Sequence, residues 1–369
     1  MKNYLTASIS ESAIRHNVAT LRAHVGDQVK LCLVVKDDCY GHGMGVLYPV
    51  LSELVDGFAV ASPIEALELR QKGYHGFILC FLSAYFDDFK VQDELVWQEI
   101  TQTVMSKSAL DSIQSAAKRL GKKARVHLKV DTGMGRMGIP ARQAPDLIEA
   151  IQACPDVELT GIYTHFATAD EAERSEVFRQ LDLFKSILPT SGNVICHAAN
   201  SAAIIDFPET HFDMVRPGLA IYGCHPSDFL DHDLGLKPCM SVNAKLIAVK
   251  HVYKGQRSGY GLTHEFEQDG RIGIVPIGYG DGYFRCLSGK AVVRINGKNA
   301  PVCGRVSMDQ MTVDVSDIDD VKVGDEVEVI SSDPEAPNCV ENLARLAGTI
   351  PYEITCHLGH NILRHQLVD

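Results

Sequence analysis

Chemically reactive side chains stand at the ends of several short apolar stretches in this sequence. Lysines occupy two of these places, Lys36 and Lys129. Histidine, serine and arginine occupy three more, in the segments 164–166, 197–201 and 216–219. A lysine that ends an apolar run is costly to bury unless it is paired or used. Because five stretches end in this way, we favour a shared chemical role over an interfacial lysine with a packed stem and a solvated head.

Lys36 has the properties of a nucleophile that would bind a carbonyl cofactor. Desolvation and neighbouring charge lower the pKa of a lysine toward neutrality, and the neutral amine attacks carbonyl groups. The phosphate of such a cofactor needs backbone N–H groups and hydroxyls, and Asn200-Ser201 and Gly218-Leu219 are placed to supply them. Taken singly, each glycine is more often an ordinary turn residue.

The elements that would position these residues alternate regularly between residues 30 and 223. Many of the β-rich stretches are continuously apolar, which is typical of strands covered on both faces. The eight stretches are Leu31–Lys36, Gly57–Ser62, Gly76–Ser83, Ile100–Ser106, Arg125–Thr132, Leu159–Phe166, Asn193–Ala199 and Met214–Gly223. Helical patterns lie between them, and one begins with a capping box at Ser62 and closes at Gly73.

This alternation predicts an α/β fold, a (β/α)8 TIM-type barrel, whose functional residues sit at the C-terminal ends of the strands. A doubly wound open sheet is the main alternative. The sequence argues against the dinucleotide-binding version of this alternative, because no G-x-G-x-x-G follows the first strand.

The pattern changes near residue 236, where strand-like stretches are separated by turn signals such as Asn296-Gly297. These stretches are Cys239–Tyr253, Arg271–Ile277, Lys290–Ile295, Ala300–Val302, Met311–Val315 and Glu326–Ile330. We therefore expect a barrel over residues 10–235 and a C-terminal β-rich domain over residues 236–369.

Charge and composition exclude several classes of protein. The net charge of −12 argues against a nucleic-acid partner, because phosphate contacts need a basic face. The longest apolar stretch, about Gly76 to Phe86, is too short to cross a bilayer, and the N-terminus lacks the apolar core of a secretory signal. The eleven cysteines include no C-x-x-C pair and do not cluster with histidines at zinc-like spacings. We expect free, mostly buried thiols, no metal site and a cytoplasmic location.

The segment VVKDDCYGHG resembles the pyridoxal-phosphate signature of alanine racemases. LKVDTGMGRMG, THFATAD, HAANSA, VRPGLAIYG, SGYG, IGYGDG, GRVSMDQ and IPYEI match the same family in the same order, from about residue 5 to residue 365. The resemblance implies a (β/α)8 barrel, a C-terminal β domain joined by residues 1–9, a homodimer and pyridoxal 5'-phosphate as cofactor. The reaction implied is racemisation of L- and D-alanine, which supplies D-alanine for peptidoglycan.

The resemblance also implies a role for each matching residue. Lys36 would hold the cofactor, and Arg216 would face its pyridine nitrogen while bonded to His165. The phosphate would be bound by Tyr40, Ser201, Gly218, Leu219 and Tyr352, beside Asn200. Arg136 would contact the cofactor's phenolic oxygen and the substrate carboxylate, and Lys129 matches a lysine that is carbamylated in many members and positions that arginine. The second protomer would contribute Tyr260, Tyr279, Met308 and Asp309.

Racemisation independently requires two bases, because a proton leaves one face of the α-carbon and returns to the other. Lys36 and Tyr260 would meet this need. A free tyrosine has a pKa near ~10, so a tyrosine base needs cationic neighbours, and His165 with Arg216 would supply them. Arginine does not readily give up its proton, so the ring nitrogen opposite Arg216 would stay largely unprotonated and act as a weaker electron sink.

The sequence departs from the family pattern at four positions. Asp37 and Cys39 stand where alanines are usual, Ser307 replaces a common cysteine, and Gly280 replaces a common alanine. If Asp37 pointed inward, it would favour protonated Lys36. We expect it to point away, because adjacent strand residues face opposite sides. These departures leave substrate breadth open.

Three other functions remain as alternatives. A racemase for serine or a broader set of amino acids differs only in its side-chain pocket, which Tyr260 and Tyr352 would crowd. A barrel-type decarboxylase of basic amino acids would carry a Gly-Gly-Gly phosphate loop and a CDGxD-like motif, and this sequence has neither. A non-catalytic cofactor-binding protein of the single-barrel kind would lack the roughly 130 residues that follow the barrel here.

Overall fold

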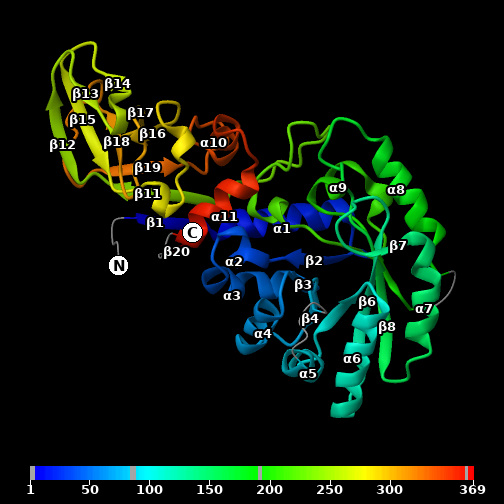
Figure 1. Ribbon diagram of the computed structural model, residues 1–369. Helices are drawn as coiled ribbons and strands as arrows, with labels where there is room; N and C mark the ends of the chain where they lie inside the picture. Colours follow the sequence, from blue (N-terminus) through cyan, green and yellow to red (C-terminus); the bar gives the residue numbers. More distant parts are fainter. Residues whose placement is uncertain (1–4, 84–88, 190–192, 362–364) are drawn as a thin grey trace.

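The chain forms a closed barrel and a separate sheet domain in this computed structural model (Figure 1). The structure describes residues 5–83, 89–189, 193–361 and 365–369. Both parts of the predicted fold class are confirmed. Among the helices of the described ranges, none combines the length and apolar character needed to cross a bilayer.

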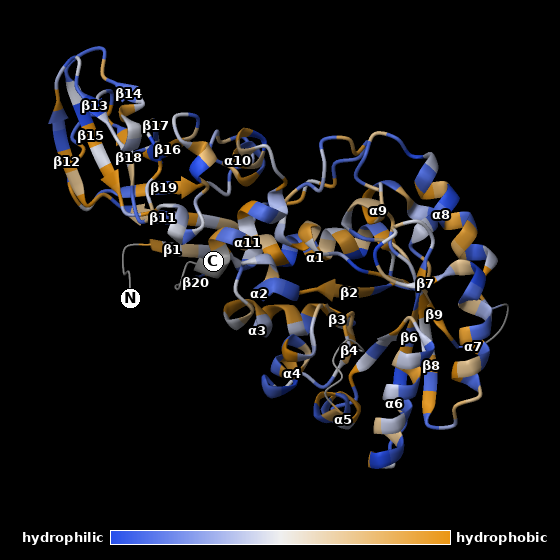
Figure 2. Cartoon of the chain, in the orientation of Figure 1, coloured by the Kyte–Doolittle hydropathy of each residue, from blue (hydrophilic) through white to orange (hydrophobic). Residues whose placement is uncertain are grey.

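Eight parallel strands form the barrel, which closes where β10 pairs with β2 and β5 pairs with β6. The strands are β2 (Lys30–Val34), β3 (Gly57–Val60), β4 (Phe77–Cys80), β5 (Thr101–Val104), β6 (Ala124–Asp131), β8 (Val157–Tyr163), β9 (Ile195–His197) and β10 (Met214–Val215). A short extra strand, β7 (Ile139–Pro140), pairs with β6. The apolar strand residues are buried, as expected for a sheet covered on both faces, and β2 has the hydrophobic colour in Figure 2.

Helices follow the strands and pack around the barrel (Figure 1). They are α1 (Glu11–Val25), α2 (Lys36–Tyr40), α3 (Met44–Leu54), α4 (Pro63–Gln71), α5 (Phe89–Trp97), α6 (Lys107–Leu120), α7 (Ala144–Gln152), α8 (Ser175–Ser186) and α9 (Ser201–Asp206), with 3-10 turns η1 (Ala141–Gln143), η2 (Pro208–Thr210) and η3 (Leu219–Tyr222). The predicted capping box forms at α4, where Ser62 and Glu65 exchange side-chain and backbone hydrogen bonds. Gly73, just beyond α4, has a φ of +89°.

Seven of the eight barrel strands are shorter than their predicted stretches, and the shortening matters most in the first and the last. The first ends at Val34, so Lys36 begins α2 rather than ending a strand. The last keeps only Met214 and Val215, because Pro217 lacks an N–H for the ladder and the chain turns into η3. Both shortenings place the chemically important residues in turns beyond the strand ends.

The sheet domain contains a nine-stranded sheet in the order β12-β15-β18-β17-β16-β19-β11-β1-β20. Its strands are β11 (Met240–Lys245), β12 (Ala248–Val252), β15 (Gly270–Val275), β16 (Val292–Ile295), β17 (Lys298–Cys303), β18 (Met311–Asp314), β19 (Glu326–Ile330), β20 (His365–Val368) and the N-terminal β1 (Leu5–Ser10). β1 runs antiparallel to β11 and parallel to β20, so residues 5–10 lie within this sheet. The predicted turn at Asn296-Gly297 joins β16 to β17, and both residues have positive φ.

The remaining elements of the sheet domain connect it to the barrel or extend it outward. A hairpin of β13 (Arg257–Ser258) and β14 (His264–Glu265) encloses η4 (Tyr260–Leu262). The 3-10 turns η5 (Tyr279–Asp281) and η6 (Arg285–Leu287) and the helices α10 (Val340–Ala347) and α11 (Pro351–Asn361) complete it. α11 packs against α2, so the sheet domain contacts the turn that carries Lys36.

Candidate active site

Lys36 begins a single left-handed helical turn directly after β2. The four residues that follow it, Asp37, Asp38, Cys39 and Tyr40, all have φ between +50° and +58°. A left-handed conformation costs about 1–2 kcal/mol for each residue that carries a Cβ. Such a turn persists only where its surroundings hold it in place.

Buried side chains hold the far end of this turn. His42 donates its Nδ1–H to the carbonyl oxygens of Cys39 and Tyr40 at 3.0 and 3.1 Å, and its ring stacks on Tyr222. Asp38 accepts from the Met44 amide at 2.7 Å. Burial lowers the pKa of His42 to about 4, so this ring is neutral at physiological pH. These contacts give His42 a structural role in the turn.

Asp37 is solvent-exposed, and the reason differs from the one expected. The residue lies in the left-handed turn and not on a strand, so strand alternation does not set its direction. Its backbone N–H is directed to the Glu65 carboxylate, at 2.8 Å.

A small cradle lies beside the turn and has the donors that a phosphate needs. The Ser201 hydroxyl oxygen accepts from the amides of Gly218 and Ala220 at 3.0 and 3.3 Å. A Cβ at Gly218 would lie 2.5 Å from the Tyr40 hydroxyl oxygen, so only glycine leaves this space open. Tyr352 is next to this group, with its ring centre 5.8 Å from that of Tyr40.

Two further residues that we assigned to the phosphate region have clear positions. Leu219 is fully buried at the start of η3, directly after Gly218. Asn200 caps α9, since its Oδ1 accepts from the Ala203 amide at 3.0 Å. The structure thus gives Asn200 a local structural role.

Arg216 is 3% exposed, and its guanidinium makes three hydrogen bonds within the barrel. Its guanidinium donates to the carbonyl oxygens of Thr164 and Ala198, both at 2.8 Å, and to Nδ1 of His197 at 2.7 Å. Burial lowers the pKa of Arg216 to about 10, so the group remains cationic near neutral pH.

The imidazole bonded to Arg216 is His197, and this corrects the expected bond from His165. A guanidinium only donates, so Nδ1 of His197 must accept and its Nε2 must carry the proton. That Nε2 lies 2.8 Å from Nδ1 of His127. Burial and the Arg216 charge lower the pKa of His127 to about 3 and that of His197 well below its ordinary value.

The chain of groups from Arg216 through His197 to His127 was not predicted from the sequence. One signal was available, because His127 and Lys129 are two residues apart on β6 and therefore share its inner face. By this tautomer argument Nε2 of His127 is protonated, and it has no hydrogen-bond partner among the described residues. Leaving this buried N–H unpaired costs free energy. The hydrogen-bonded series from Arg216 to His127 is therefore best explained by the orientation that it gives Arg216.

Lys129, Arg136 and His165 lie around the same strand ends. Lys129 is 8% exposed, and burial followed by the charges of Arg216 and Arg136 lowers its pKa to about 8. Arg136 is exposed in the loop after β6. Asp131 holds the first turn of this loop, because its carboxylate accepts from two glycine amides. Desolvation and the charges of Arg216 and Lys129 lower the pKa of His165 well below its usual value, so His165 is neutral.

Tyr260, Tyr279, Met308 and Asp309 lie in exposed loops of the sheet domain, and the β13–β14 hairpin that encloses Tyr260 lies well apart from α2 (Figure 1). Tyr260 is 71% exposed and Met308 is 56% exposed. The loops contact one another closely, since the amides of Tyr279 and Gly280 donate to the carbonyl oxygens of Ser307 and Met308 at 3.0 and 2.8 Å.

We call Tyr260, Leu262, Tyr279 and Met308 the exposed loop patch. A Cβ at Gly280 would lie 3.0 Å from the Met308 carbonyl oxygen, so the alanine that is usual at this position would require a small shift.

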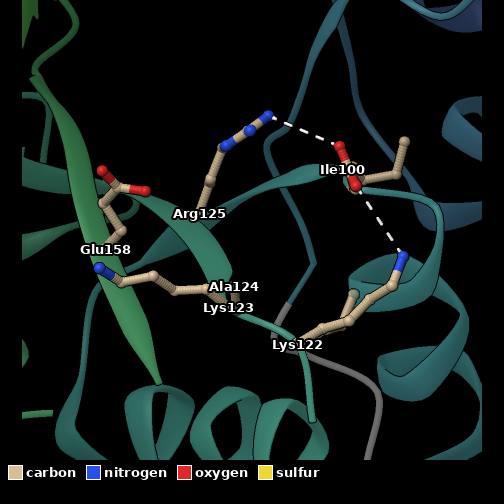
Figure 3. Close-up of a pocket in the computed structure, with 8 residues that line it drawn as sticks. Ile100, Lys122, Lys123, Ala124, Arg125 and Glu158 are labelled. Carbon is tan, nitrogen blue, oxygen red and sulfur yellow. Dashed lines mark ion pairs between the residues drawn. The ribbon is translucent and has the colours of Figure 1, made fainter. Parts of the chain in front are cut away.

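A pocket of about 340 Å³ lies elsewhere, at the N-terminal ends of β5, β6 and β8 (Figure 3). Lys122 and Arg125 approach the Glu99 carboxylate there, each at 3.8 Å. Barrel chemistry takes place at the opposite end of the strands. The pocket therefore has no part in the candidate site.

Comparison with known proteins covers nearly the whole chain. Residues 9–226 match the family described as "Alanine racemase, N-terminal domain", and residues 239–366 match "Alanine racemase, C-terminal domain". A protein of Desulforamulus reducens named "Alanine racemase" is 42% identical over 99% of both chains. Another of that name from Syntrophobacter fumaroxidans is 38% identical over 96% of this chain and 95% of its own length.

Solved structures agree with these sequence matches. The alanine racemase of D-cycloserine-producing Streptomyces lavendulae superposes with a TM-score of 0.93 at 35% identity, covering 100% of this chain and 98% of its own. The biosynthetic alanine racemase of Pseudomonas aeruginosa gives 0.89 at 32% identity, covering 99% of both chains.

Proposed function

Because the chain belongs to the alanine racemase family, we propose that it interconverts L- and D-alanine with pyridoxal phosphate bound at Lys36. The observation that carries this proposal is the gathering of Lys36, the Tyr40–Ser201–Gly218 cradle and Arg216 around the C-terminal strand ends of one barrel. When bound, pyridoxal phosphate withdraws electrons from the α-carbon of an amino acid and makes its proton removable.

The residues present fit this cofactor. The cradle would supply the hydroxyls of Tyr40 and Ser201 for the phosphate, and the glycine at position 218 leaves space that a side chain would fill. Arg216 is a fixed buried cation suited to a ring nitrogen, which is an acceptor. Because arginine holds its proton, this arrangement would limit the lifetime of negative charge on the substrate and so disfavour side reactions.

We assign the two proton transfers to two chains. Nζ of Lys36 would exchange the α-proton on one face, and the hydroxyl of Tyr260 of the partner subunit would do so on the other. In its own chain Tyr260 is 71% exposed, in the β13–β14 hairpin, which lies well apart from α2 in Figure 1. An exposed apolar patch of this kind is typical of an interface, and docking it over a second barrel would complete both sites.

Substrate contacts follow from the same assignment. Arg136 would bind the amino-acid carboxylate, and Tyr279, Met308 and Asp309 of the partner subunit would border the substrate. Tyr260 and Tyr352 would crowd the side-chain pocket, so we expect alanine to be preferred over serine and larger amino acids.

Chiral chromatography tests the reaction directly. The purified protein with pyridoxal phosphate is incubated separately with single enantiomers of alanine, serine and a panel of other amino acids. We expect alanine to approach an equal mixture from either enantiomer, faster than any other member of the panel. Inversion led by serine would make the protein a racemase of another substrate. Carbon dioxide release, or cofactor binding without inversion, would refute the racemase proposal.

Mixing two inactive variants tests the shared sites. Lys36→Ala and Tyr260→Phe homodimers should both be inactive, and subunit exchange should restore up to one working site in each heterodimer. Native mass spectrometry of the mixture, which distinguishes the heterodimer from both homodimers by mass, reports the extent of exchange. No recovery after confirmed exchange would place both bases on one chain.

We further propose that Lys129 is carbamylated. With a pKa of about 8, roughly a tenth of this amine is neutral at pH 7, since each pH unit is a tenfold change. The neutral amine attacks carbon dioxide and loses a proton, and the resulting carboxylate would position Arg136. Carbon dioxide depletion should lower the activity severalfold, and bicarbonate should restore it. Lys129→Ala should abolish this sensitivity, whereas Lys123→Ala, which changes an exposed lysine, should preserve it.

We propose a biosynthetic role for the product, the supply of D-alanine for peptidoglycan. Expression of the chain in a bacterium that requires D-alanine tests it, with Lys36→Ala as the inactive control. Growth without added D-alanine is expected only with the wild-type chain.

A further inference from the structure

The left-handed turn after Lys36 is held at its near end by one side chain from a different element. Asp37 carries the first amide after Lys36, and it donates to Oε1 of Glu65 at 2.8 Å. Glu65 lies in the first turn of α4, after the neighbouring strand β3.

The second oxygen of Glu65 binds the N-terminus of α4. Oε2 accepts from the amides of Ala61 and Ser62, both at 2.8 Å, and from the Ser62 hydroxyl at 3.1 Å. One carboxylate therefore ties the end of β3 and the start of α4 to the residue that follows Lys36. A capping box needs only the second oxygen, so Oε1 has a separate purpose.

We propose that Glu65 is a positioning residue for Lys36, which fixes the direction of the cofactor lysine by holding the Asp37 amide. This inference rests on the proposed function only in naming Lys36 as the cofactor lysine. Hydrogen bonds to an ionised acceptor are stronger than neutral ones, which suits a contact that must stabilise four consecutive residues with positive φ. The contacts at His42 and Asp38 hold the far end of the turn and do not reach Asp37.

Glu65→Gln separates the two purposes of the carboxylate. Its one carbonyl oxygen should stay with the three donors of Ala61 and Ser62, and its amide N–H groups would then face the Asp37 N–H, donor against donor. Ser62→Ala is the matched control, because it weakens the cap of α4 and leaves the Asp37 contact intact. The two variants should lose similar thermal stability.

Hydrogen exchange followed by mass spectrometry in the cofactor-free protein measures the clamp itself. Exchange in the peptide that contains Asp37 should accelerate at least about tenfold in Glu65→Gln, which corresponds to the loss of one bond to a charged acceptor. It should be unchanged in Ser62→Ala. Equal exchange in both variants would refute the clamp. If Glu65→Gln does not fold, Glu65→Asp, which is too short to keep both contacts, takes its place.

The holoenzyme measures the consequence for Lys36. In Glu65→Gln, pyridoxal phosphate should dissociate at least about tenfold faster, as followed by its visible absorbance after dilution. The kcat should fall while KM for alanine stays within about twofold, because no substrate contact changes. Normal dissociation and kcat alongside accelerated exchange would show that the clamp does not position Lys36. Failure of wild-type protein to bind the cofactor at Lys36 would instead refute the proposed function and leave the exchange result standing.

Discussion

The two halves of the proposed site differ in how the chain holds them. Arg216 in the barrel is 3% exposed and makes three hydrogen bonds within its own chain. Tyr260 in the sheet domain is 71% exposed, on a hairpin of two-residue strands. The barrel half is preorganised by its own core, whereas the loop half has a fixed backbone and exposed side chains. Under the proposed function, such a site would acquire its second base only when two chains meet.

The largest expected effect comes from a change in the loop half, which should lower the activity without lowering the stability. Tyr260→Phe removes only one hydroxyl, from a side chain that is 71% exposed in its own chain, so the melting temperature should change little. The kcat should fall about 100- to 10,000-fold, the usual contribution of a general base. Steady-state kinetics and thermal melting of the variant test both statements.

Tyr253→Phe is the matched control, since Tyr253 is 61% exposed in the same domain but outside the exposed loop patch. Its activity should equal that of wild-type protein. If Tyr260→Phe kept more than a tenth of the wild-type kcat, the loop half would have no catalytic base.

A change in the barrel half should instead alter stability and activity together. His197→Leu leaves a buried guanidinium N–H without its acceptor, which we expect to cost about 3 kcal/mol of unfolding free energy. Urea denaturation measures this loss. The absorbance of bound cofactor should also change, because Arg216 would no longer be held toward the ring nitrogen.

His211→Leu provides the comparison for that variant. His211 is buried, and its ring bonds to the neutral Ile204 carbonyl, so the expected cost is about 1 kcal/mol. Its cofactor spectrum should match the wild-type spectrum. Identical spectra for both variants would mean that His197 does not orient Arg216.

Acid should weaken the barrel through its buried histidines. The pKa of His42 is lowered from 6.5 to about 4 and that of His127 to about 3, so below pH 6.5 the unfolded chain binds protons that the folded chain does not. Stability is therefore present above pH 6.5 and is lost as the pH falls toward 4. Each such histidine contributes at most about 1.4 kcal/mol per pH unit.

His42→Asn should reduce this slope, because the amide keeps a donor for the Cys39 and Tyr40 carbonyls and does not titrate. His251→Asn, which changes an exposed histidine of the sheet domain, should leave the slope unchanged. Urea midpoints measured from pH 7 to pH 4 give both slopes. A parallel decrease in wild-type protein and His42→Asn would assign the acid sensitivity to other groups.

The sequence was a good guide to the elements because their signals are local. Apolar strands, the capping box at Ser62 and the Asn296-Gly297 turn depend on neighbouring residues, and all three formed as predicted. The strand ends were less certain. Pro217 and the left-handed turn after Lys36 shorten two strands for reasons that an apolar run does not record.

The missed parts of the site are contacts between distant segments. The bond of His197 to Arg216 depends on how β9 and β10 lie side by side. The Asp37–Glu65 contact joins residues 28 apart in the sequence, and both look like ordinary surface acids when read alone. A single sequence shows which residues are capable of chemistry, whereas the fold decides which of them touch.

The smallest expected effect concerns Asn200, which the sequence placed in the cofactor site and the structure places at the cap of α9. Asn200→Ala removes the acceptor of the Ala203 amide and should cost about 1 kcal/mol. Asn200→Ser restores a neutral capping oxygen and should recover most of that stability. If capping is the main role of Asn200, the cofactor affinity of the serine variant, measured by equilibrium titration, should lie within about threefold of wild type. A serine variant with normal stability and cofactor affinity reduced about tenfold or more would show that the asparagine amide binds the cofactor directly. Asn200 would then belong to the preorganised barrel half of the site because it binds the cofactor, and not only because it lies beside it.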